Sequence, residues 1–330
     1  MDLLRKSLFQ DIQIDEWGDI EYCKMHDLVH DIAESVVRPK SSVVNSNAKN
    51  ITKRTRHLSL HLSLPREIPT HLSRAHNLRT VRMKDASRFG MDIDSTFKRL
   101  RVLDMPRGWG HSNISKMKHL RFLSLSTYNK RKLPSSITEL KNLQTLKLSE
   151  FERLKQLPEE IKELVNLRHL ELRRCRALTG MPRVTDGKHL PLFGQLPSLQ
   201  FLSLWDMESL EYMEDESSSG SGSEDSLCSS SSSSGGAAPT PTFFPSLKTL
   251  RLLYCPELKG WWRSQAEEEA TTTLQDQQQQ HLKKLPSFPS LSKLWILSCP
   301  NLASMPILQP CLERLHLLNV SKKVVEEELR

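Results

Sequence analysis

The sequence predicts an α/β solenoid, in which short parallel strands line one face of a coil and short helices or irregular turns line the other. The prediction rests on a leucine spacing that recurs along the chain. In Leu167–Leu178, leucines stand at offsets 0, 3, 5 and 11 and a cysteine at offset 8. Residues 247–258 and 291–302 repeat the frame, the cysteine included, with an isoleucine at one position. This is the spacing of leucine-rich repeats.

The spacing has a physical explanation. Side chains alternate along a strand, so Leu170 and Leu172 point to the same side. Leu167 enters that interior from the corner before the strand, and Leu178 enters it from the return path. One coil cannot bury these side chains alone, so the repeat is stable only as a stack of neighbours. We expect Cys175 to fill the corner as a small apolar plug with a weak donor.

The repeats are predicted to occupy residues 56–330, with strands on the concave face. Early strands begin near leucines that follow one another at a repeat-like spacing, namely Leu78, Leu100, Leu120, Leu143 and Leu167. Later strands begin near Leu199, Leu247, Leu291 and Leu312, and two long steps between them carry insertions at about 214–242 and 264–281. The first insertion is rich in Ser, Gly and acidic residues, and cannot bury enough apolar surface to order itself. It is either a passive loop or a phosphorylation site at Ser223 or Ser226.

Residues 1–43 do not follow the leucine frame. An apolar stripe near the start predicts a short helix, and residues 11–25 predict two strands around a turn at Gly18-Asp19. A helix is expected from Asp27 to about Val37, because apolar residues recur at i, i+4 and i+8 before Pro39. Helix, hairpin and helix together suit the end of a winged-helix module. The polar stretch 44–55 is interpreted as a linker.

The triplet Met25-His26-Asp27, within CKMHDLVHDIAESVV, closely resembles the MHD motif of plant NLR immune receptors. In that family the motif ends the nucleotide-binding (NB-ARC) region, in a winged-helix subdomain immediately before the leucine-rich repeats. The resemblance covers essentially the whole chain and is most specific over residues 1–37. It implies that His26 touches the terminal phosphate of bound ADP and helps to hold the off state. It also implies that Met25 packs and that Asp27 caps the helix.

The sequence departs from the family in one respect that concerns the cofactor. It contains no GxxxxGK(S/T) loop and no apolar strand ending in paired aspartates, the groups that hold phosphate and magnesium. We therefore expect no cofactor in this chain itself. The ADP or ATP of the family would require the upstream domain.

A metal site is an alternative interpretation of the same helix. His26 and His30 are four residues apart, as in HExxH, with Asp27 where the glutamate would stand. Aspartate is one methylene shorter, and no third ligand follows at a diagnostic spacing. The competing interpretation is that His30 and Asp31 lie on a solvated helix face.

Charge and cysteine usage restrict the class of protein. The net charge is +8, with Lys and Arg distributed along the chain, so we do not expect a nucleic-acid or acidic-lipid footprint. Three of the cysteines follow the repeat frame and no CxxC pair occurs, which argues against a disulfide framework or a zinc site. No run of 18 apolar residues predicts a membrane span. We expect a reduced, cytoplasmic or nucleocytoplasmic chain.

The residues between the inward leucines face solvent on the concave sheet and indicate where binding would occur. They are polar in the first coils and become aromatic and basic toward the C-terminus. The predicted protein-binding residues are Arg173, Phe201, Trp205, Arg251 and Trp295, because aromatic and arginine side chains anchor protein interfaces. The alternative is that the large insertions cover these aromatics and make them local core. For Trp261-Trp262 a packing role is expected.

No Ser/His/Asp or Cys/His constellation recurs at an interpretable spacing, so we do not expect an enzyme. The expected function is that of an intracellular immune-receptor chain acting by protein recognition and autoregulation. Its partner would be a pathogen effector, a guarded host protein or the receptor's own NB-ARC domain. The alternatives are a general leucine-rich-repeat scaffold with no immune role and a zinc hydrolase built on HDLVHD.

Overall fold

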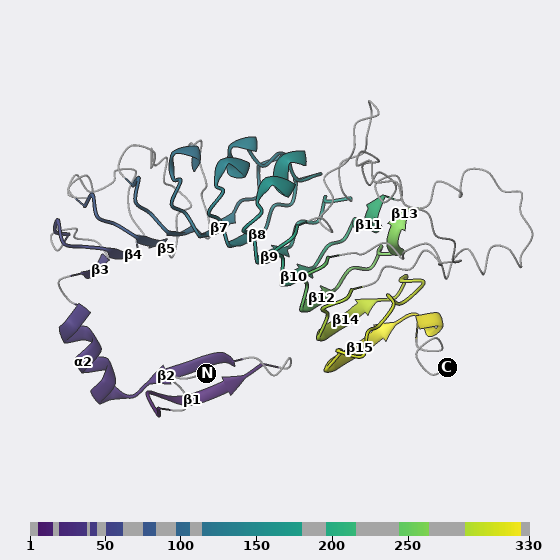
Figure 1. Cartoon of the computed structure of the whole chain (residues 1–330), viewed down its shortest axis with the longest axis horizontal. Helices are drawn as coiled ribbons and strands as arrows, with labels where there is room; N and C mark the ends of the chain where they lie inside the picture. Colours follow the sequence, from purple (N-terminus) through teal and green to yellow (C-terminus); the bar gives the residue numbers. More distant parts are fainter. Residues whose placement is uncertain are drawn as a thin grey trace, which may run out of the picture.

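The structure is a computed structural model, and it describes residues 6–15, 20–37, 40–44, 51–61, 75–83, 97–105, 114–179, 196–215, 244–263 and 288–324. Its main feature is an 11-stranded sheet in the order β15-β14-β12-β10-β9-β8-β7-β6-β5-β4-β3. All neighbouring strands in this sheet are parallel. They lie side by side along the inner face of an arc, in chain order (Figure 1). The predicted leucine-rich-repeat solenoid is confirmed.

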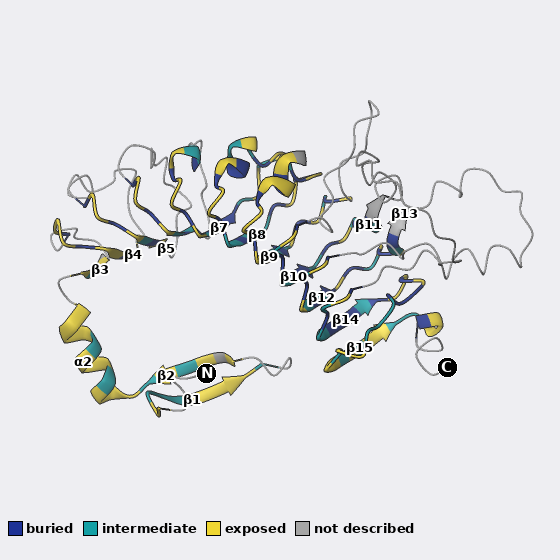
Figure 2. Cartoon of the chain, in the orientation of Figure 1, coloured by how far each residue is buried: buried dark blue, intermediate teal, exposed yellow. Residues whose placement is uncertain are grey.

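The strands of this sheet are short and come once per coil. They are β3 (Ser41–Val44), β4 (His57–Leu60), β5 (Thr80–Met83), β6 (Val102–Met105), β7 (Phe122–Ser126), β8 (Thr145–Ser149), β9 (His169–Arg173), β10 (Phe201–Trp205), β12 (Thr249–Leu253), β14 (Lys293–Cys299) and β15 (Arg314–Val320). Buried residues alternate with half-buried or exposed ones along most of them (Figure 2).

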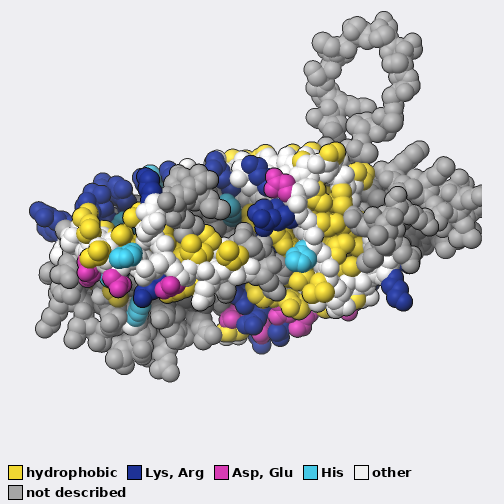
Figure 3. Space-filling model, turned by 90° about the horizontal axis from the view of Figure 1, so that it is seen from below, with side chains coloured by type: hydrophobic (Ala, Val, Ile, Leu, Met, Phe, Trp, Pro, Cys, Tyr) yellow, Lys and Arg dark blue, Asp and Glu magenta, His cyan; other side chains and the backbone are white. Residues whose placement is uncertain are grey.

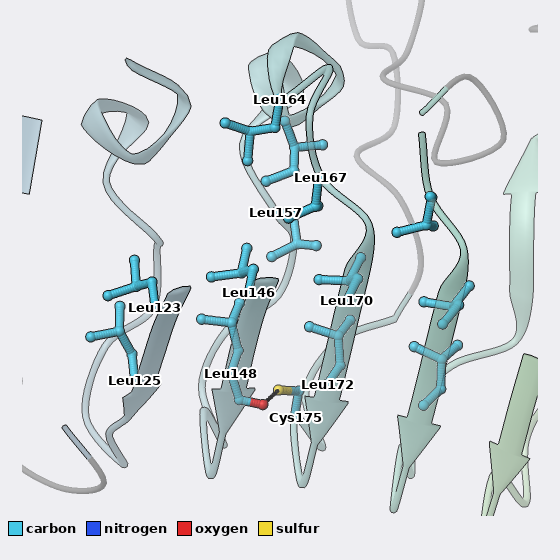
Figure 4. Packing of buried hydrophobic residues seen from close by; sticks show 14 of the residues in the cluster. Leu123, Leu125, Leu146, Leu148, Leu157, Leu164, Leu167, Leu170, Leu172 and Cys175 are labelled. Atoms are coloured by element: carbon cyan, nitrogen blue, oxygen red, sulfur yellow. Dashed lines mark hydrogen bonds between the residues drawn. The ribbon is translucent and has the colours of Figure 1, made fainter. Parts of the chain in front are cut away.

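The leucine frame explains how each strand is held. Leu170 and Leu172 of β9 are fully buried, and their Cα partners are the corresponding leucines of β8 and β10. Figure 4 shows Leu167 and Leu157 entering the same interior from the corner and from the return path. The inward residues of successive coils belong to one hydrophobic cluster, so the core is a continuous column along the stack.

The outer side of the coils carries short helical turns, as predicted. They are η3 (Ile114–Lys116), η4 (Ser135–Glu139) and η5 (Glu159–Glu163). Pro134 and Pro158 stand directly before the last two, each in extended backbone. Proline fixes φ near −65° and lacks an N–H, so it suits the residue before a first turn.

A second, two-stranded parallel sheet lies away from the concave strands, formed by β11 (Tyr212–Asp215) and β13 (Gly260–Arg263). Within it Trp261 is buried, its indole Nε1 donates to the carbonyl of Ser304 at 3.0 Å, and its ring meets that of Phe288 edge-on at 5.5 Å. The predicted packing role of Trp261 is confirmed.

Side-chain donors at the corner before several of the strands tie successive coils together. Asn142 and Asn166 each donate at 2.8 Å to a lysine carbonyl of the preceding coil. In the Pro-Ser coils a serine takes over this role, with Ser246 donating to the carbonyl of Pro197 and Ser290 to that of Pro245. The Pro-Ser sequence is therefore a second way of making the same bond.

A left-handed residue follows the last concave position of six strands. These residues are Glu150, Arg174, Asp206, Tyr254, Ser298 and Asn319, with φ between 52° and 60°. The left-handed backbone conformation costs an L-residue about 1–2 kcal/mol, and backbone hydrogen bonds to the next coil offset this cost. The N–H of Arg174 donates to the carbonyl of Trp205, and the N–H of Tyr254 to that of Leu297, both at 2.8 Å. We call this row the left-handed corner.

The cysteines of the repeat frame are buried next to this corner, as predicted. The Cys175 thiol contacts the carbonyl of Leu148 on the neighbouring coil at 3.8 Å (Figure 4). Burial raises its pKa to about 12. A hydrogen bond with Cys299 and burial raise the pKa of Cys255. The thiols of Cys175 and Cys255 therefore stay protonated and act as packing groups, whereas the hydrogen bond with Cys255 lowers the pKa of Cys299.

The N-terminal residues form a separate small module. An antiparallel hairpin of β1 (Phe9–Ile14) and β2 (Ile20–Met25) precedes α2 (Asp27–Val37). The predicted hairpin and helix are confirmed. Of the predicted first helix, residues 1–5 lie outside the described residues, and Phe9 belongs to β1. None of the residues described in α2 is buried, so its apolar stripe at Leu28, Ile32 and Val36 is exposed.

Two predicted boundaries need comment. β3 pairs with β4, so the sheet begins at Ser41, ahead of the expected repeat start at residue 56 and across the edge of the expected linker. Strand pairing uses backbone groups that every residue except proline offers in full, so a polar sequence does not prevent it. Both insertions lie outside the described residues, except for Glu214 and Asp215, which belong to β11.

Candidate protein-binding site

The sheet register brings the five predicted binding residues together on four adjacent strands. Arg173 of β9 is the Cα partner of Trp205 on β10, and Arg251 of β12 is the partner of Trp295 on β14. Phe201 begins β10. These strands are direct neighbours in the sheet, so residues far apart in the sequence form one group on the C-terminal half of the concave face.

Cations and aromatic rings alternate within this group. The guanidinium carbon of Arg173 lies 4.2 Å from the ring centre of Trp205. The guanidinium carbon of Arg251 lies 5.3 Å from the ring of Phe201 and 4.9 Å from that of Trp295. Such contacts contribute about 0.5–1 kcal/mol at exposed sites and more when desolvated. They hold long, flexible arginine side chains in place before any partner arrives.

The prediction that Trp295 is exposed is wrong. Its side chain is only 2% exposed, and it forms a small buried cluster with Leu253 and Leu297 against which Trp205 packs. The reason is that two leucines occupy concave positions of β12 and β14, where earlier coils carry polar residues. Together with the overlying Arg251 they enclose the indole. For Trp295 the local-core interpretation is therefore correct.

The other four predicted residues keep a surface for contact. Arg173, Phe201, Trp205 and Arg251 are all half-buried. The structure adds Tyr254, which is 49% exposed and stacks on Trp205 with ring centres 6.5 Å apart. We refer to these five residues as the aromatic–arginine patch. In the sequence, Tyr254 could have been identified because it directly follows Leu253, the last concave position of its coil, which is the position of the left-handed corner.

The surroundings of the patch are apolar on one side and charged on the other. Leu318 of β15 is 61% exposed, and apolar side chains gather toward the C-terminal half in Figure 3. On the N-terminal side, the ring of His169 lies tilted against Phe201 at 5.7 Å. Burial, Lys147 and Arg168 lower the pKa of His169, so it is neutral around pH 7. Lys147 itself is paired with Glu171 at 2.6 Å.

A chain of ion pairs borders the patch along the left-handed corner. Arg174 bridges Glu150 at 3.5 Å and Asp206 at 3.7 Å, and Arg176 joins Asp206 at 3.3 Å. The hydrogen bond and charge of Asp206 raise the pKa of Arg176. These pairs are exposed, so each contributes little stability, but they fix a polar rim beside the aromatic rings.

At the other end of the chain, the predicted phosphate contact His26 stands just before α2. Its ring Nδ1 accepts a hydrogen bond from the backbone N–H of Leu28 at 3.3 Å. The histidine side chain thus accepts a hydrogen bond in the first turn, and Asp27, the expected cap, is the first residue of α2. The ring is held at the helix start, where positive backbone N–H groups also favour an anion.

The metal interpretation of α2 is not supported by the placement of its ligands. Among the described residues, the single group of metal-type donors is His30, Asp31 and Glu34, and it does not include His26. All three side chains are exposed, and His30 Nδ1 lies 3.7 Å from the carboxylate of Asp31. These features match the solvated helix face that was the competing hypothesis.

Within the part of the chain that the structure describes, no helix is both long and apolar enough to cross a membrane.

One parallel strand per coil, inward leucines and short convex turns define a leucine-rich-repeat solenoid, and this chain folds as one. Comparison with known families agrees: a family described as "Leucine-rich repeat region" matches residues 77–186. A second family, described as "Disease resistance protein Winged helix domain", matches residues 1–33. The predicted resemblance to plant NLR disease resistance proteins is confirmed.

The chain is also similar to individual proteins. The chain is 28% identical over 181 residues to "Disease resistance RPP13-like protein 4" of Arabidopsis thaliana, a match that covers 50% of this chain and 20% of the relative. Among solved structures, the leucine-rich repeat domain of the type III effector XopL is 22% identical, with a TM-score of 0.35, covering 57% of this chain and 72% of that one. The plant peptide hormone receptor RGFR1, in complex with RGF2, is 16% identical with a TM-score of 0.36, covering 94% and 48%.

Proposed function

We propose that this chain is a protein-recognition and autoregulatory part of a plant-type immune receptor and captures its partner on the aromatic–arginine patch. The observation that carries the proposal is the stacked arrangement of Arg173, Trp205 and Tyr254, with Phe201 and Arg251 beside them. These residue types dominate the energy of protein interfaces.

The patch is suited to binding because its side chains are already ordered. Binding normally costs about 0.5–1.5 kcal/mol for each flexible side chain that becomes fixed. Here Trp295, Leu253 and Leu297 form a packed floor, and the rings and guanidinium groups lie in contact above and beside it. A partner can therefore desolvate flat aromatic area while few groups of the receptor lose freedom.

The candidate partners are a pathogen effector, a guarded host protein and the receptor's own NB-ARC domain. The winged-helix match at residues 1–33 supports an immune receptor over a general scaffold, because a scaffold has no need of that segment. In a receptor with the upstream nucleotide domain, His26 would contact the terminal phosphate of ADP. The proposed role involves no catalysis.

The proposal is tested by quantitative capture with the purified chain. The baits are the parent, the double variant Phe201→Ala and Trp205→Ala, and the control Thr145→Ala and Ser149→Ala, which removes two half-buried concave residues of β8. They are incubated with extracts of healthy and infected plant tissue and, separately, with a purified NB-ARC domain. We expect the first double variant alone to lose partners at an unchanged melting temperature. Equal capture by all three baits would contradict the role of the patch.

A further inference from the structure

The net charge of +8 conceals a strong asymmetry along the solenoid. Residues 51–134 contain 19 of the 47 Lys and Arg residues but only 5 of the 39 Asp and Glu residues. The remainder of the chain is therefore net acidic. The expectation that basic residues are evenly distributed does not hold at the level of the coils.

The structure places much of this charge on one side of four consecutive coils. Each coil offers two exposed residues in the turn before its strand and one exposed residue directly before the strand begins. The twelve positions, which we call the basic flank, are Lys53, Arg54, Arg56, His76, Asn77, Arg79, Lys98, Arg99, Arg101, Lys118, His119 and Arg121. Nine are Lys or Arg, and none is acidic. Dark blue side chains gather along one edge of the N-terminal half in Figure 3.

Four arginines of the flank are in register. The backbone N–H of Arg79 donates to the carbonyl of Arg56, that of Arg101 to Arg79, and that of Arg121 to Arg101, at 2.7–2.8 Å. Parallel strands are about 4.8 Å apart, so the ladder spans about 15 Å. Within the described residues these four arginines form no ion pair; of the other flank residues, Lys118 is paired with Glu139.

The repeat frame does not require this charge. In later coils the position of the ladder holds Gln144, Arg168, Gln200, Lys248, Ser292 and Glu313, whose strands pair in the same way. Four of these six coils therefore carry no cation there. Like charges about 5 Å apart repel one another and lower stability unless anions approach. The row of arginines lowers stability and is not needed by the fold, so its presence points to an anionic ligand.

The surface chemistry distinguishes between anionic ligands. Protein interfaces are enriched in aromatic residues and Met as well as in Arg, whereas the twelve flank positions carry Arg and Lys with no apolar and no benzene-ring side chain. The flank is built from turns and strand starts, so it offers no helix for a DNA groove and no ring for stacking on single-stranded bases. What it offers is a two-dimensional array of cations: three positions wide and four coils long.

We propose that the basic flank binds the surface of an anionic lipid bilayer. The array faces the planar layer of lipid phosphates and carboxylates with its cations, while their aliphatic stems remain over the coils. Basic residues near such a surface each strengthen binding by about fivefold at moderate salt. The contact is peripheral, and it leaves the aromatic–arginine patch of the C-terminal coils open to a protein partner.

The test is co-sedimentation of the full chain with vesicles of phosphatidylcholine containing phosphatidylserine, with pure phosphatidylcholine vesicles as reference. The flank variant carries Arg56→Gln, Arg79→Gln, Arg101→Gln and Arg121→Gln. The matched control carries Arg131→Gln, Lys132→Gln, Arg153→Gln and Lys155→Gln, which removes the same charge from exposed residues beyond the opposite ends of β7 and β8. Circular dichroism melting verifies that all three proteins are folded.

We expect the parent to bind only the anionic vesicles and to be released at high salt, where the Debye length falls to about 3 Å. The flank variant should lose roughly a hundredfold or more in affinity, and the control should lose at most a few fold. Equal losses in both variants, or equal binding to pure phosphatidylcholine, would overturn the proposal. So would binding to duplex DNA or polyglutamate without binding to the vesicles. Protein capture by the C-terminal patch is measured separately, so the two proposals can fail independently.

Discussion

Replacing Leu170 by alanine should show how the stack is held together. The side chain is fully buried in β9, with Leu146 of β8 and Leu202 of β10 as its Cα partners on either side. Leu→Ala changes in cores cost about 2–5 kcal/mol, depending on how far the surroundings can collapse into the space. Here backbone pairing fixes both neighbouring strands, so the coils cannot close the cavity. We therefore expect a loss in the upper half of that range, about 3–5 kcal/mol.

The adjacent residue provides a matched control. Glu171 points to the concave side and pairs with Lys147 at 2.6 Å, while its side chain keeps 28% of its surface exposed. Exposed or partly exposed ion pairs contribute about 0–1 kcal/mol, so Glu171→Ala should cost little. The assay is urea unfolding followed by circular dichroism. Comparable losses in the two variants would show that the assigned strand register is incorrect.

Hydrogen exchange adds a spatial criterion to the same experiment. Each coil of a solenoid contacts only its neighbours, so the effect of a cavity should be local. Leu170→Ala should accelerate amide exchange in β8, β9 and β10 far more than in β4 or β5. A uniform acceleration along the sheet would contradict the nearest-neighbour description of its stability.

Three further outcomes are expected. Trp295→Ala should cost about 3–5 kcal/mol of unfolding free energy in urea titrations, because the indole lies in the core, whereas Trp205→Ala should cost clearly less. Equal costs would contradict the burial of Trp295. Burial raises the folded-state pKa of Cys175 to about 12 from an ordinary value of 9.0, so the contribution of this thiol to the free energy of unfolding should be full below pH 9 and fall as the pH rises toward 12. Unfolding free energy measured against pH should therefore fall more steeply in the parent than in Cys175→Ala. Identical slopes would show that the thiol titrates with the same pKa in the folded and unfolded states. Calorimetry of this chain alone should show ADP binding no tighter than millimolar. In a chain that carries the upstream domain in cis, His26→Ala should speed ADP release by removing a charge-assisted contact of about 1–3 kcal/mol. Unchanged release would exclude the contact.

The sequence was sufficient to predict the solenoid because its signal is periodic. Leu167, Leu170 and Leu172 have one structural role in every coil, and repetition separates that role from chance. The strand starts and the concave positions followed directly from the frame. The start of the sheet at Ser41 did not follow from the frame. Strand β3 pairs with β4 through backbone hydrogen bonds, but its sequence contains no leucine at the frame positions.

The candidate site was predicted less completely, for a different reason. Alternation assigns Trp295 to the concave face correctly, but exposure on that face also depends on the side chains of adjacent coils, and Leu253 of β12 is 42 residues away in the sequence. Leu253 and Leu297 enclose the ring only once the strands are in register. The basic flank was missed because a total charge carries no information on which turn a lysine occupies.

The left-handed corner has a consequence for how such a chain can change. At six strand ends the backbone takes a conformation that most residues avoid, and bonds between main-chain groups hold it there. The fold therefore makes almost no demand on the side chain, and Glu, Arg, Asp, Tyr, Ser and Asn all occupy equivalent places. Beside the apolar column of inward residues, most of them leucines, runs a row of positions that accept many residue types, and it borders the surface where a partner would bind. A single substitution there would change the rim of the proposed binding surface and leave the scaffold that presents it unchanged.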